Sequence, residues 1–348
     1  MDAKTLYPDF DDLPKVEGQP QGCAWGLFDK DGVKDIYGTL NFITPETVKA
    51  AAAEVQHGIS VSLNWSLNAI KFPFGHRQAP VHTPFALPAE MGTKGLHGFD
   101  DSLTFNTQYS SQWDSLCHVT HSHSGETYNG FVPTVEKLSS TTSTKKENEK
   151  EGLLPTIDRW HTRGGLVARG VLIDWKRYAE EVINSKGETG PKWHPLDGYK
   201  ITFDDLEAAA KHFGVEFKVG DVLLVRTGMT SVMENPTPED FGKMADSKLA
   251  GVEGSERTAR WVWNKRFAAV AGDSAAFEAI EYSKETGCDL VLHRYFLTMF
   301  GMSIGELWDL DALGEACKKT GKYSFLLTSA PLNHPGLVAS PPNATAVL

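Results

Sequence analysis

Long apolar runs, a secretion signal and paired cysteines are all missing from this sequence. No stretch reaches the roughly 18 consecutive apolar residues that a membrane-spanning helix needs. Residues 1–22, MDAKTLYPDFDDLPKVEGQPQG, are polar and acidic and contain no apolar centre of a signal peptide. The four cysteines form no CxxC pair, so reduced thiols are expected rather than a disulfide framework. We therefore expect a soluble, cytoplasmic protein.

Clustered basic charge and the motifs of several enzyme classes are missing as well. The net charge is −11 at pH 7 and no basic stripe stands out, so a nucleic-acid partner is not expected. No G-x-S-x-G elbow occurs, which argues against a serine hydrolase of that type. A glycine-rich phosphate loop is also absent. A small-molecule substrate is the expected partner, with no nucleic acid and no membrane.

The apolar pattern predicts an α/β protein. Thr44 and Pro45 open a helix that should run to Gly58, because threonine caps helices and proline suits the first turn. Buried strands are predicted at 169–175 and 220–227, where apolar residues dominate. Further strands and helices alternate with these, namely strand 59–64, helix 202–213, helix 255–266, strand 267–271 and strand 324–328. This alternation indicates a mixed sheet whose faces are covered by helices.

We interpret residues 1–348 as a single domain, since no linker or repeat divides the chain. Residues 1–40 should form an N-terminal arm of turns, fixed to the body through Trp25 and Phe28. Residues 66–100 are rich in Pro, Gly, His and Phe, and are predicted to form a long loop or lid over a site.

Two segments carry residues suited to metal chemistry. The first, Asn106 to Gly130, holds an aspartate and three histidines within ten positions, namely Asp114, His118, His121 and His123. Asp114 and His118 are four residues apart and can lie on the same side of a helix or turn. Such a pair is also common on ordinary polar surfaces.

The second segment, Leu292 to Leu310, embeds His293 and Glu306 in apolar sequence. Burying these two side chains unpaired is costly, so they need partners. The alternative is a core histidine bonded to a carbonyl, together with a helix-capping glutamate. Asp273 follows a predicted strand end, where α/β proteins often place functional groups, and a helix cap is its alternative role.

The first segment resembles the signature of the cyclase family, which includes kynurenine formamidase and isatin hydrolase. Its best-known members carry His-x-Gly-Thr-His-x-Asp-x-Pro-x-His, and Asp114 and His118 match the Asp and the last His. Gln108 and Gln112 stand where the first two histidines would be. The QWD-x3-H form here is similar to a longer branch of the family. The resemblance extends over most of the chain, through GTLNFITPE at Gly38–Glu46, AGDSAAFE at Ala271–Glu278, GMSIGELWDL at Gly301–Leu310 and APLNHPGLVASPPNA near the C-terminus.

The resemblance implies a metal-dependent hydrolase with a mixed, partly barrel-like β-sheet flanked by helices. One metal site of the family uses the first two histidines with the Asp. The other uses that Asp, the last His, and a His and a Glu near the C-terminal end. Only the second site survives here, as Asp114, His118, His293 and Glu306. We therefore expect one divalent metal per chain, Zn²⁺, Mn²⁺ or Fe²⁺, because glutamine is a weaker ligand than imidazole.

The implied reaction is hydrolysis of a C–N bond in a small amide or cyclic amide by metal-activated water. Gln108 or Gln112 would stabilise the developing oxyanion, and His118 or His121 would move the proton. Gln112 has an alternative role, which is to hold Asp114 in place by a hydrogen bond.

Trp113, Tyr128 and His123 are the candidates for contacting a planar substrate. A place in the core is the alternative for the two aromatic residues, and an exposed loop is the alternative for the histidine.

Three other functions fit the same residues. A lactonase would use the same chemistry on a small cyclic ester. A lyase or cyclase would move protons without consuming water. A non-catalytic binder would have kept the fold with a degraded metal site, as the two glutamines allow. The resemblance also implies a homodimer or homotetramer.

Overall fold

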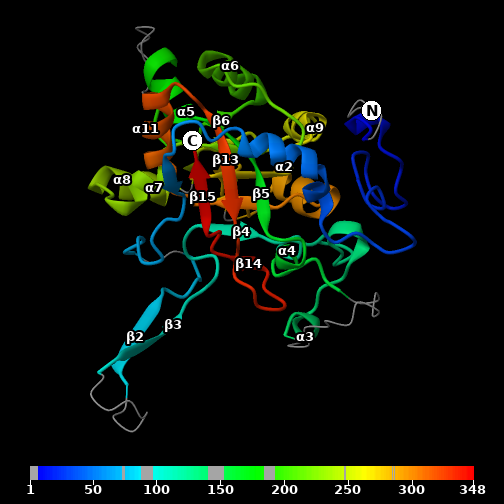
Figure 1. Cartoon of the computed structure of the whole chain (residues 1–348), viewed down its shortest axis with the longest axis horizontal. Helices are drawn as coiled ribbons and strands as arrows, with labels where there is room; N and C mark the ends of the chain where they lie inside the picture. The colour runs from blue at the N-terminus through cyan, green and yellow to red at the C-terminus, as the bar shows by residue number, and fades with distance from the viewer. Residues whose placement is uncertain are drawn as a thin grey trace.

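A nine-stranded sheet lies at the centre of the computed structural model, which describes residues 7–72, 75–87, 97–139, 153–183, 193–246, 248–283, 285 and 287–348 (Figure 1). The strand order is β1-β15-β13-β5-β7-β10-β12-β4-β14. In that order the strands are β1 (Ser60–Ser62), β15 (Ala344–Val347), β13 (Ser324–Ser329), β5 (Leu166–Ile173), β7 (Val222–Val225), β10 (Ala269–Gly272), β12 (Ile304–Glu306), β4 (Gln112–Asp114) and β14 (Ala339–Ser340). The predicted α/β fold with a partly barrel-like sheet flanked by helices is confirmed.

The four central strands β5, β7, β10 and β12 run parallel to one another, and β4 pairs antiparallel with β12. One row of the sheet runs from strand to strand through Val171, Leu223, Val270 and Ile304 to Asp114, which pairs in turn with Ala339 of β14. The residues of these strands are almost all buried, as expected for a parallel sheet covered on both faces. Asp114 is therefore fixed against the rigid centre of the molecule.

Helices and short helical turns surround the sheet. In chain order they are η1 (Phe10–Asp12), η2 (Gly38–Phe42), α2 (Pro45–Ala52), η4 (Tyr128–Gly130), α3 (Val135–Leu138), α4 (Arg159–Thr162), α5 (Trp175–Tyr178), η5 (Ala179–Ile183), α6 (Phe203–Phe213), α7 (Met229–Glu234), α8 (Pro238–Ala245), α9 (Glu256–Lys265), α10 (Val291–His293), η7 (Arg294–Phe300) and α11 (Asp311–Thr320). Three two-stranded sheets complete the fold: β2 (Val81–Ala86) with β3 (Phe99–Thr104), β8 (Lys248–Leu249) with β11 (Ile280–Glu281), and β6 (Lys200–Ile201) with β9 (Gly251–Val252).

Side chains that alternate along the central strands build two apolar cores. On one face, Val171 packs in a cluster with Leu206 of α6 and Trp263 of α9. On the other face, Leu172 shares a cluster with Leu313 of α11. Successive residues of a strand point to opposite faces, so each central strand contributes to both cores.

The helix starts agree with the cap residues in the sequence. The hydroxyl of Thr44 accepts a hydrogen bond from the backbone N–H of Thr47, which caps α2. This helix lies across β5 (Figure 1) and ends at Ala52, earlier than the predicted end at Gly58. Beyond the helix, the backbone N–H of His57 donates to the carbonyl of Leu348 at 3.0 Å, so this segment runs beside the C-terminus.

The N-terminal arm, described from residue 7, is fixed to the body by buried side chains. Phe10 and Phe28 belong to the same apolar cluster as the central strands. The indole N–H of Trp25 donates to the carbonyl of Thr298 at 2.6 Å. The predicted anchoring through Trp25 and Phe28 is therefore confirmed.

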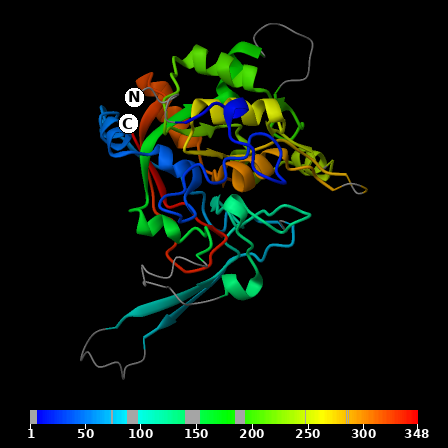
Figure 2. The same ribbon diagram turned by 90° about the vertical axis from the view of Figure 1, so that its right-hand side faces the viewer.

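Strands β2 and β3 form a hairpin that projects from the body (Figures 1 and 2). Every residue of both strands is exposed, and Phe99 is 82% exposed. The prediction of a loop or lid at 66–100 is thus wrong for residues 81–86 and 99–100, which are paired strands directed away from the sheet. The exposed pair Asp100 and Asp101 interrupts any apolar alternation in β3, which explains why the sequence did not indicate a strand. Residues 73–74 and 88–96 of the predicted loop lie outside the described residues.

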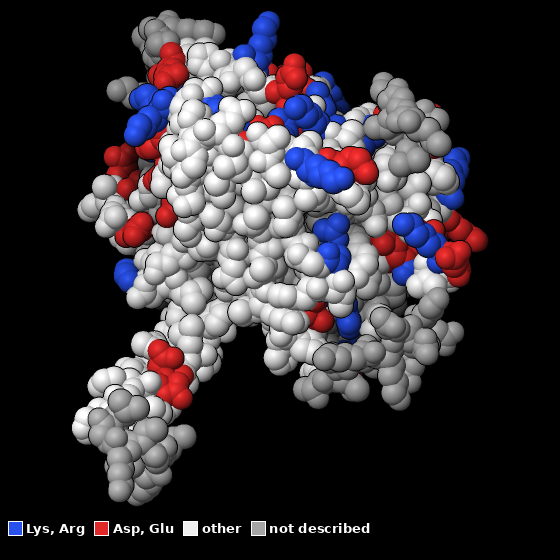
Figure 3. Space-filling view, in the orientation of Figure 1, with Lys and Arg blue, Asp and Glu red and all other residues white. Residues whose placement is uncertain are grey.

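Charge is dispersed on the face that Figure 3 shows, where blue and red groups are interspersed and no continuous basic stripe forms. Acidic groups mark the projecting hairpin in the same view. Within the described ranges, no helix is long and apolar enough to cross a bilayer. The cytoplasmic location stays a prediction.

Gly38 makes one of the closest backbone approaches among the described glycines, and it supports a first prediction. Its φ is +55°, and an added Cβ would lie 1.9 Å from the carbonyl oxygen of Gly301. Gly58 also has a positive φ, +66°, but open space surrounds it. We expect Gly58→Ala to cost about 1 kcal/mol, the price of a left-handed alanine, and Gly38→Ala to cost about 3 kcal/mol or more, because backbone atoms must also move apart. Urea unfolding of the two variants measures the difference, and equal losses would contradict the crowding argument.

Candidate metal centre

The end of β4 and the end of β12 bring two carboxylates to one face of the sheet. The register pairs Gln112 with Glu306, and Asp114 with Ile304. Side chains alternate along a strand, so Gln112 and Asp114 share a face while Trp113 points to the other one. The amide nitrogen of Gln112 accordingly donates to Glu306 Oε2 at 2.6 Å.

His293 reaches the same place from the helical segment that covers this face. It ends the short helix α10, directly before η7. Its Nε2 lies 3.1 Å from Glu306 Oε1 and 4.0 Å from Asp114 Oδ2. Ligand atoms of Asp114, His293 and Glu306 all lie within 4.8 Å of one another, and all three residues are buried. These side chains can therefore hold one metal ion.

His118 and Gln108 lie at the more open side of this cluster. His118 Nε2 is 4.0 Å from Asp114 Oδ2, and the side chain of His118 is 25% exposed. The amide nitrogen of Gln108 donates to Asp114 Oδ1 at 2.8 Å and lies 2.9 Å from His118 Nδ1. His118 is thus a neighbour of the compact set rather than a member of it.

The electrostatics of the cluster favour a cation. Burial raises the pKa of Asp114, and the nearby charge of Glu306 raises it further. Burial lowers the pKa of the His293 imidazole, but its hydrogen bonds to Glu278 and Glu306 outweigh burial and raise that pKa to about 10. Two buried carboxylates thus favour positive charge between them.

A divalent metal fits this donor set. Asp114 Oδ2 and Gln112 Oε1 are buried and have no hydrogen-bond partner among the described residues. A buried polar atom without a partner is costly, and a metal ligated by Asp114 Oδ2 removes that cost. Imidazole and carboxylate together suit Zn²⁺ and Mn²⁺, and the geometry does not select between them.

Known proteins are similar to this chain in sequence family and in fold. The family model named "Cyclase" matches residues 59–279, well over half of the chain. The chain belongs to the cyclase family. The resemblance seen in the sequence is therefore confirmed at the level of the family.

Solved structures show how much of the fold of this chain is shared. A crystal structure described as a novel cyclase is 29% identical, with a TM-score of 0.73, and the match covers 94% of this chain and 99% of the other. Isatin hydrolase A from Ralstonia solanacearum is 15% identical, with a TM-score of 0.51 and coverage of 87% and 97%. Isatin hydrolase A from Labrenzia aggregata, bound to benzyl benzoate, is 16% identical, with a TM-score of 0.53 and coverage of 85% and 94%. The two hydrolases show the shared fold. No sequence among curated proteins matches this chain significantly.

The structure places Trp113 and Tyr128 in the apolar core, which is the alternative that the sequence left open for them. Both side chains are fully buried. Trp113 packs against Trp160 and Trp308, on the sheet face opposite Asp114. The hydroxyl of Tyr128 donates to a carboxylate oxygen of Asp35 at 3.1 Å, so this side chain is also part of the core.

His121 and His123 lie together and are not members of the compact set. They line an open pocket of about 560 Å³ beside the N-terminal arm, together with Arg294. His121 stacks edge-on against Trp25, and burial lowers the pKa of its imidazole. Among the described residues, no hydrogen bond joins either ring to Asp114, His293 or Glu306. The compact metal-ligand set does not include these two histidines, and their catalytic and substrate-binding roles stay predictions.

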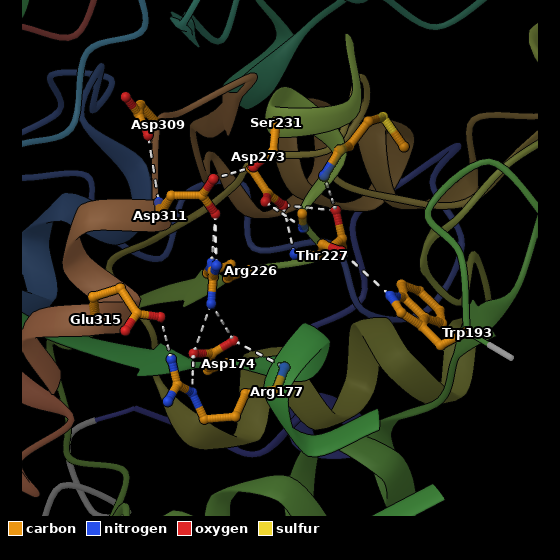
Figure 4. Close-up of polar contacts among 12 residues, drawn as sticks. Asp174, Arg177, Trp193, Arg226, Thr227, Ser231, Asp273, Asp309, Asp311 and Glu315 are labelled. Carbon is orange, nitrogen blue, oxygen red and sulfur yellow. Dashed lines mark hydrogen bonds and ion pairs between the residues drawn. The ribbon is translucent and has the colours of Figure 1, made fainter. Parts of the chain in front are cut away.

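Asp273 belongs to a buried polar network at the carboxyl ends of the parallel strands (Figure 4). Its carboxylate accepts hydrogen bonds from the N–H and hydroxyl of Thr227 and from the N–H of Gly228. Burial raises the pKa of Asp273 to about 6. Asp273 thus holds the turn after β7, which is neither of the two roles considered from the sequence.

Glu278 is the residue near the metal centre that the sequence analysis did not single out. It is buried, and its Oε1 lies 2.8 Å from His293 Nδ1. The segment AGDSAAFE is part of the resemblance, but Asp273 was the residue of this segment that the sequence interpretation assigned a role. The available signal was a glutamate directly after the apolar stretch Ala275–Phe277, because such a buried carboxylate needs partners.

Proposed function

We propose that this protein is a metal-dependent hydrolase that cleaves the C–N bond of a small amide or cyclic amide. The observation that carries the proposal is the buried cluster of Asp114, His293 and Glu306, in which Asp114 Oδ2 has no hydrogen-bond partner among the described residues. Membership of the cyclase family and the fold shared with isatin hydrolases support it. Isatin is a cyclic amide, so it is the first substrate to test.

Asp114, His293 and Glu306 would hold the metal. When bound, a divalent metal supplies Lewis acidity that lowers the pKa of water toward neutrality and polarises a carbonyl group. Gln112 is fully buried and donates to Glu306 Oε2, so we assign it to orienting Glu306. Gln108 donates to Asp114 Oδ1 and orients that carboxylate in the same way. One of the two N–H groups of the Gln112 amide is used in this hydrogen bond, and the oxyanion role of the glutamines stays a prediction.

His118 is the candidate for proton transfer in this proposal. Its imidazole is partly exposed, beside Asp114 and outside the compact set. Gln108 contacts its Nδ1 and so limits rotation of the ring. An imidazole in this position can accept a proton and return it to a leaving nitrogen.

Oxygen-18 water tests the proposed reaction. Protein supplied with Zn²⁺ or Mn²⁺ is incubated with isatin, and with a panel of small amides and lactones, in labelled water. We expect turnover of a cyclic amide with one labelled oxygen in the product, because hydrolysis consumes water. Turnover of lactones alone would mean that the protein cleaves an ester bond instead of a C–N bond. A product without label would mean that the protein is a lyase and not a hydrolase.

The variant His118→Gln separates proton transfer from metal binding. We expect a loss of about 10²–10⁴-fold in kcat with unchanged metal content, the usual range for a general acid or base. His57→Ala, at an exposed histidine far along the chain from the cluster, is the matched control and should keep wild-type turnover. Loss of the metal from His118→Gln would instead make His118 a fourth ligand, as the sequence resemblance implies.

A further inference from the structure

Glu278 is a buried carboxylate whose hydrogen bonds to the described residues all go to one short segment, Leu292–His293. Its Oε1 accepts from the backbone N–H of His293 at 2.9 Å and lies 2.8 Å from the Nδ1 of the same residue. Its Oε2 accepts from the backbone N–H of Leu292 at 2.9 Å. Both oxygens are therefore occupied by donors, which makes Glu278 unsuited to bind a metal itself.

These contacts define which nitrogen of His293 faces the cluster. Nδ1 is directed to Glu278, and Nε2 is directed to Glu306 and Asp114. With the ring proton held on Nδ1 by a carboxylate, the lone pair of the neutral imidazole lies on Nε2. A hydrogen bond of this kind fixes the ring orientation and increases its basicity as a ligand. The two backbone hydrogen bonds add a second constraint, because they fix the start of α10, from which His293 projects.

The backbone around Glu278 is closely constrained. Phe277, directly before it, has a φ of +57°, a conformation that bulky residues rarely adopt. Leu307, directly after the carboxylate Glu306, is similar with a φ of +53°. Two of the positive-φ residues thus flank the two carboxylates that contact His293, and such strain concentrates at functional sites.

Two glycines make room for Glu278. A Cβ on Gly254 would lie 2.7 Å from Glu278 Oε2, and a Cβ on Gly251 would lie 2.5 Å from the carbonyl carbon of Glu278. Strand β9 also pairs with this stretch, since the N–H of Val252 donates to the carbonyl of Phe277 at 2.9 Å. The position of Glu278 is therefore set by contacts on several sides, independently of His293.

We propose that Glu278 is a positioning residue that holds His293 with Nε2 ready to bind the metal. It acts through His293 and touches neither the substrate nor the metal. The proposal rests on the metal centre of the proposed function, but it does not depend on which bond the protein cleaves. Loss of a carboxylate partner of this kind weakens metal binding about 10–100-fold.

The experiment is a titration of metal-free protein with Co²⁺ alone, followed by visible absorption, with Zn²⁺ affinity measured by competition with a chelator. We expect Glu278→Gln to bind about 10–100-fold more weakly than wild type, with an altered Co²⁺ spectrum. Glu278→Asp keeps the carboxylate and should recover part of the affinity. In the His293→Ala background, Glu278→Gln should have little further effect, because its partner is gone.

Asp221→Asn is the matched control for general damage to the fold. Asp221 is also a buried carboxylate, bonded to Arg169 and to the backbone N–H of Lys218. This variant should lose stability in thermal unfolding while its Co²⁺ affinity stays at the wild-type value. If Glu278→Gln fails to fold, the Co²⁺ affinity of Glu278→Asp is compared with that of the wild type, and this comparison tests the positioning role.

Three results would overturn the positioning role: wild-type affinity in Glu278→Gln, an equal loss in the His293→Ala background, or a loss in Asp221→Asn as large as in Glu278→Gln. A wild-type protein that binds no Co²⁺ would overturn the metal centre together with this role. Tight binding that depends on Glu278, but no hydrolysis of any amide, would overturn the proposed reaction and leave the positioning role standing.

Discussion

His293→Ala should purify almost free of metal, whereas the wild type should hold close to one divalent ion per chain. His293 supplies the only imidazole of the compact set formed with Asp114 and Glu306. Binding of a structural zinc ion is worth about 10–16 kcal/mol in small domains, so each of about four ligands contributes roughly 3 kcal/mol, or about 10²-fold in affinity. The loss here should be at least that large, because the two remaining side chains are both carboxylates.

Elemental analysis for Zn, Mn and Fe measures this effect directly. The variant His293→Gln keeps a side chain of similar reach and guards against a loss that is due only to misfolding. His57→Ala, at an exposed histidine, should retain the wild-type metal content. Full metal content in both His293 variants would mean that the ion binds elsewhere, and the cluster would lose its assigned role.

The sequence predicted the metal centre better than its surroundings, for a physical reason. His293 and Glu306 are ionisable residues in an apolar segment, so they had to find partners, and they lie 3.1 Å apart. Asp114 and His118 were chosen as candidate ligands because they are four residues apart. A turn after a strand also allows this spacing, and Asp114 is the last residue of β4. The roles assigned to these residues as ligands stay predictions until a metal is measured.

Trp113 was misplaced because its strand was not recognised. The alternation of β4 puts Trp113 on the face opposite Gln112 and Asp114, so a strand at 112–114 would have predicted a core tryptophan. Three residues are too few for a periodic signal. Glu278 was missed for a different reason: its partner lies in a separate segment of the chain, and only the folded structure brings the two together.

The hairpin and the end of α2 show the same limit. Strand β3 carries Asp100 and Asp101 side by side and is exposed along its whole length, so no burial pattern marks it. Helix α2 stops at Ala52, and His57 beyond it pairs with Leu348 at the other end of the chain. A local apolar pattern marks neither the exposed hairpin nor this contact.

The double variant Gln108→His/Gln112→His should bind a second metal ion per chain. In the family signature these two positions are the histidines of the other metal site, whereas here each amide nitrogen donates to a carboxylate: Gln108 to Asp114 Oδ1 at 2.8 Å, and Gln112 to Glu306 Oε2 at 2.6 Å. An amide N–H is a donor and cannot bind a cation, whereas a neutral imidazole presents a lone pair. The exchange therefore turns two donors that face the carboxylates into two ligands that share Asp114 with the first ion.

Equilibrium dialysis against Mn²⁺ or Zn²⁺ counts the ions. We expect about one per chain in the wild type and about two in the double variant, because two imidazoles and a carboxylate together make a complete set of ligands. Each single variant should bind the second ion more weakly, since one ligand is missing. Gln56→His, at an exposed glutamine, is the control for adventitious binding by an added histidine. A count of one in the double variant would mean that more than the two glutamines separates this chain from the two-metal members of its family, and that Gln108 and Gln112 hold the carboxylates in a geometry that only one ion can use.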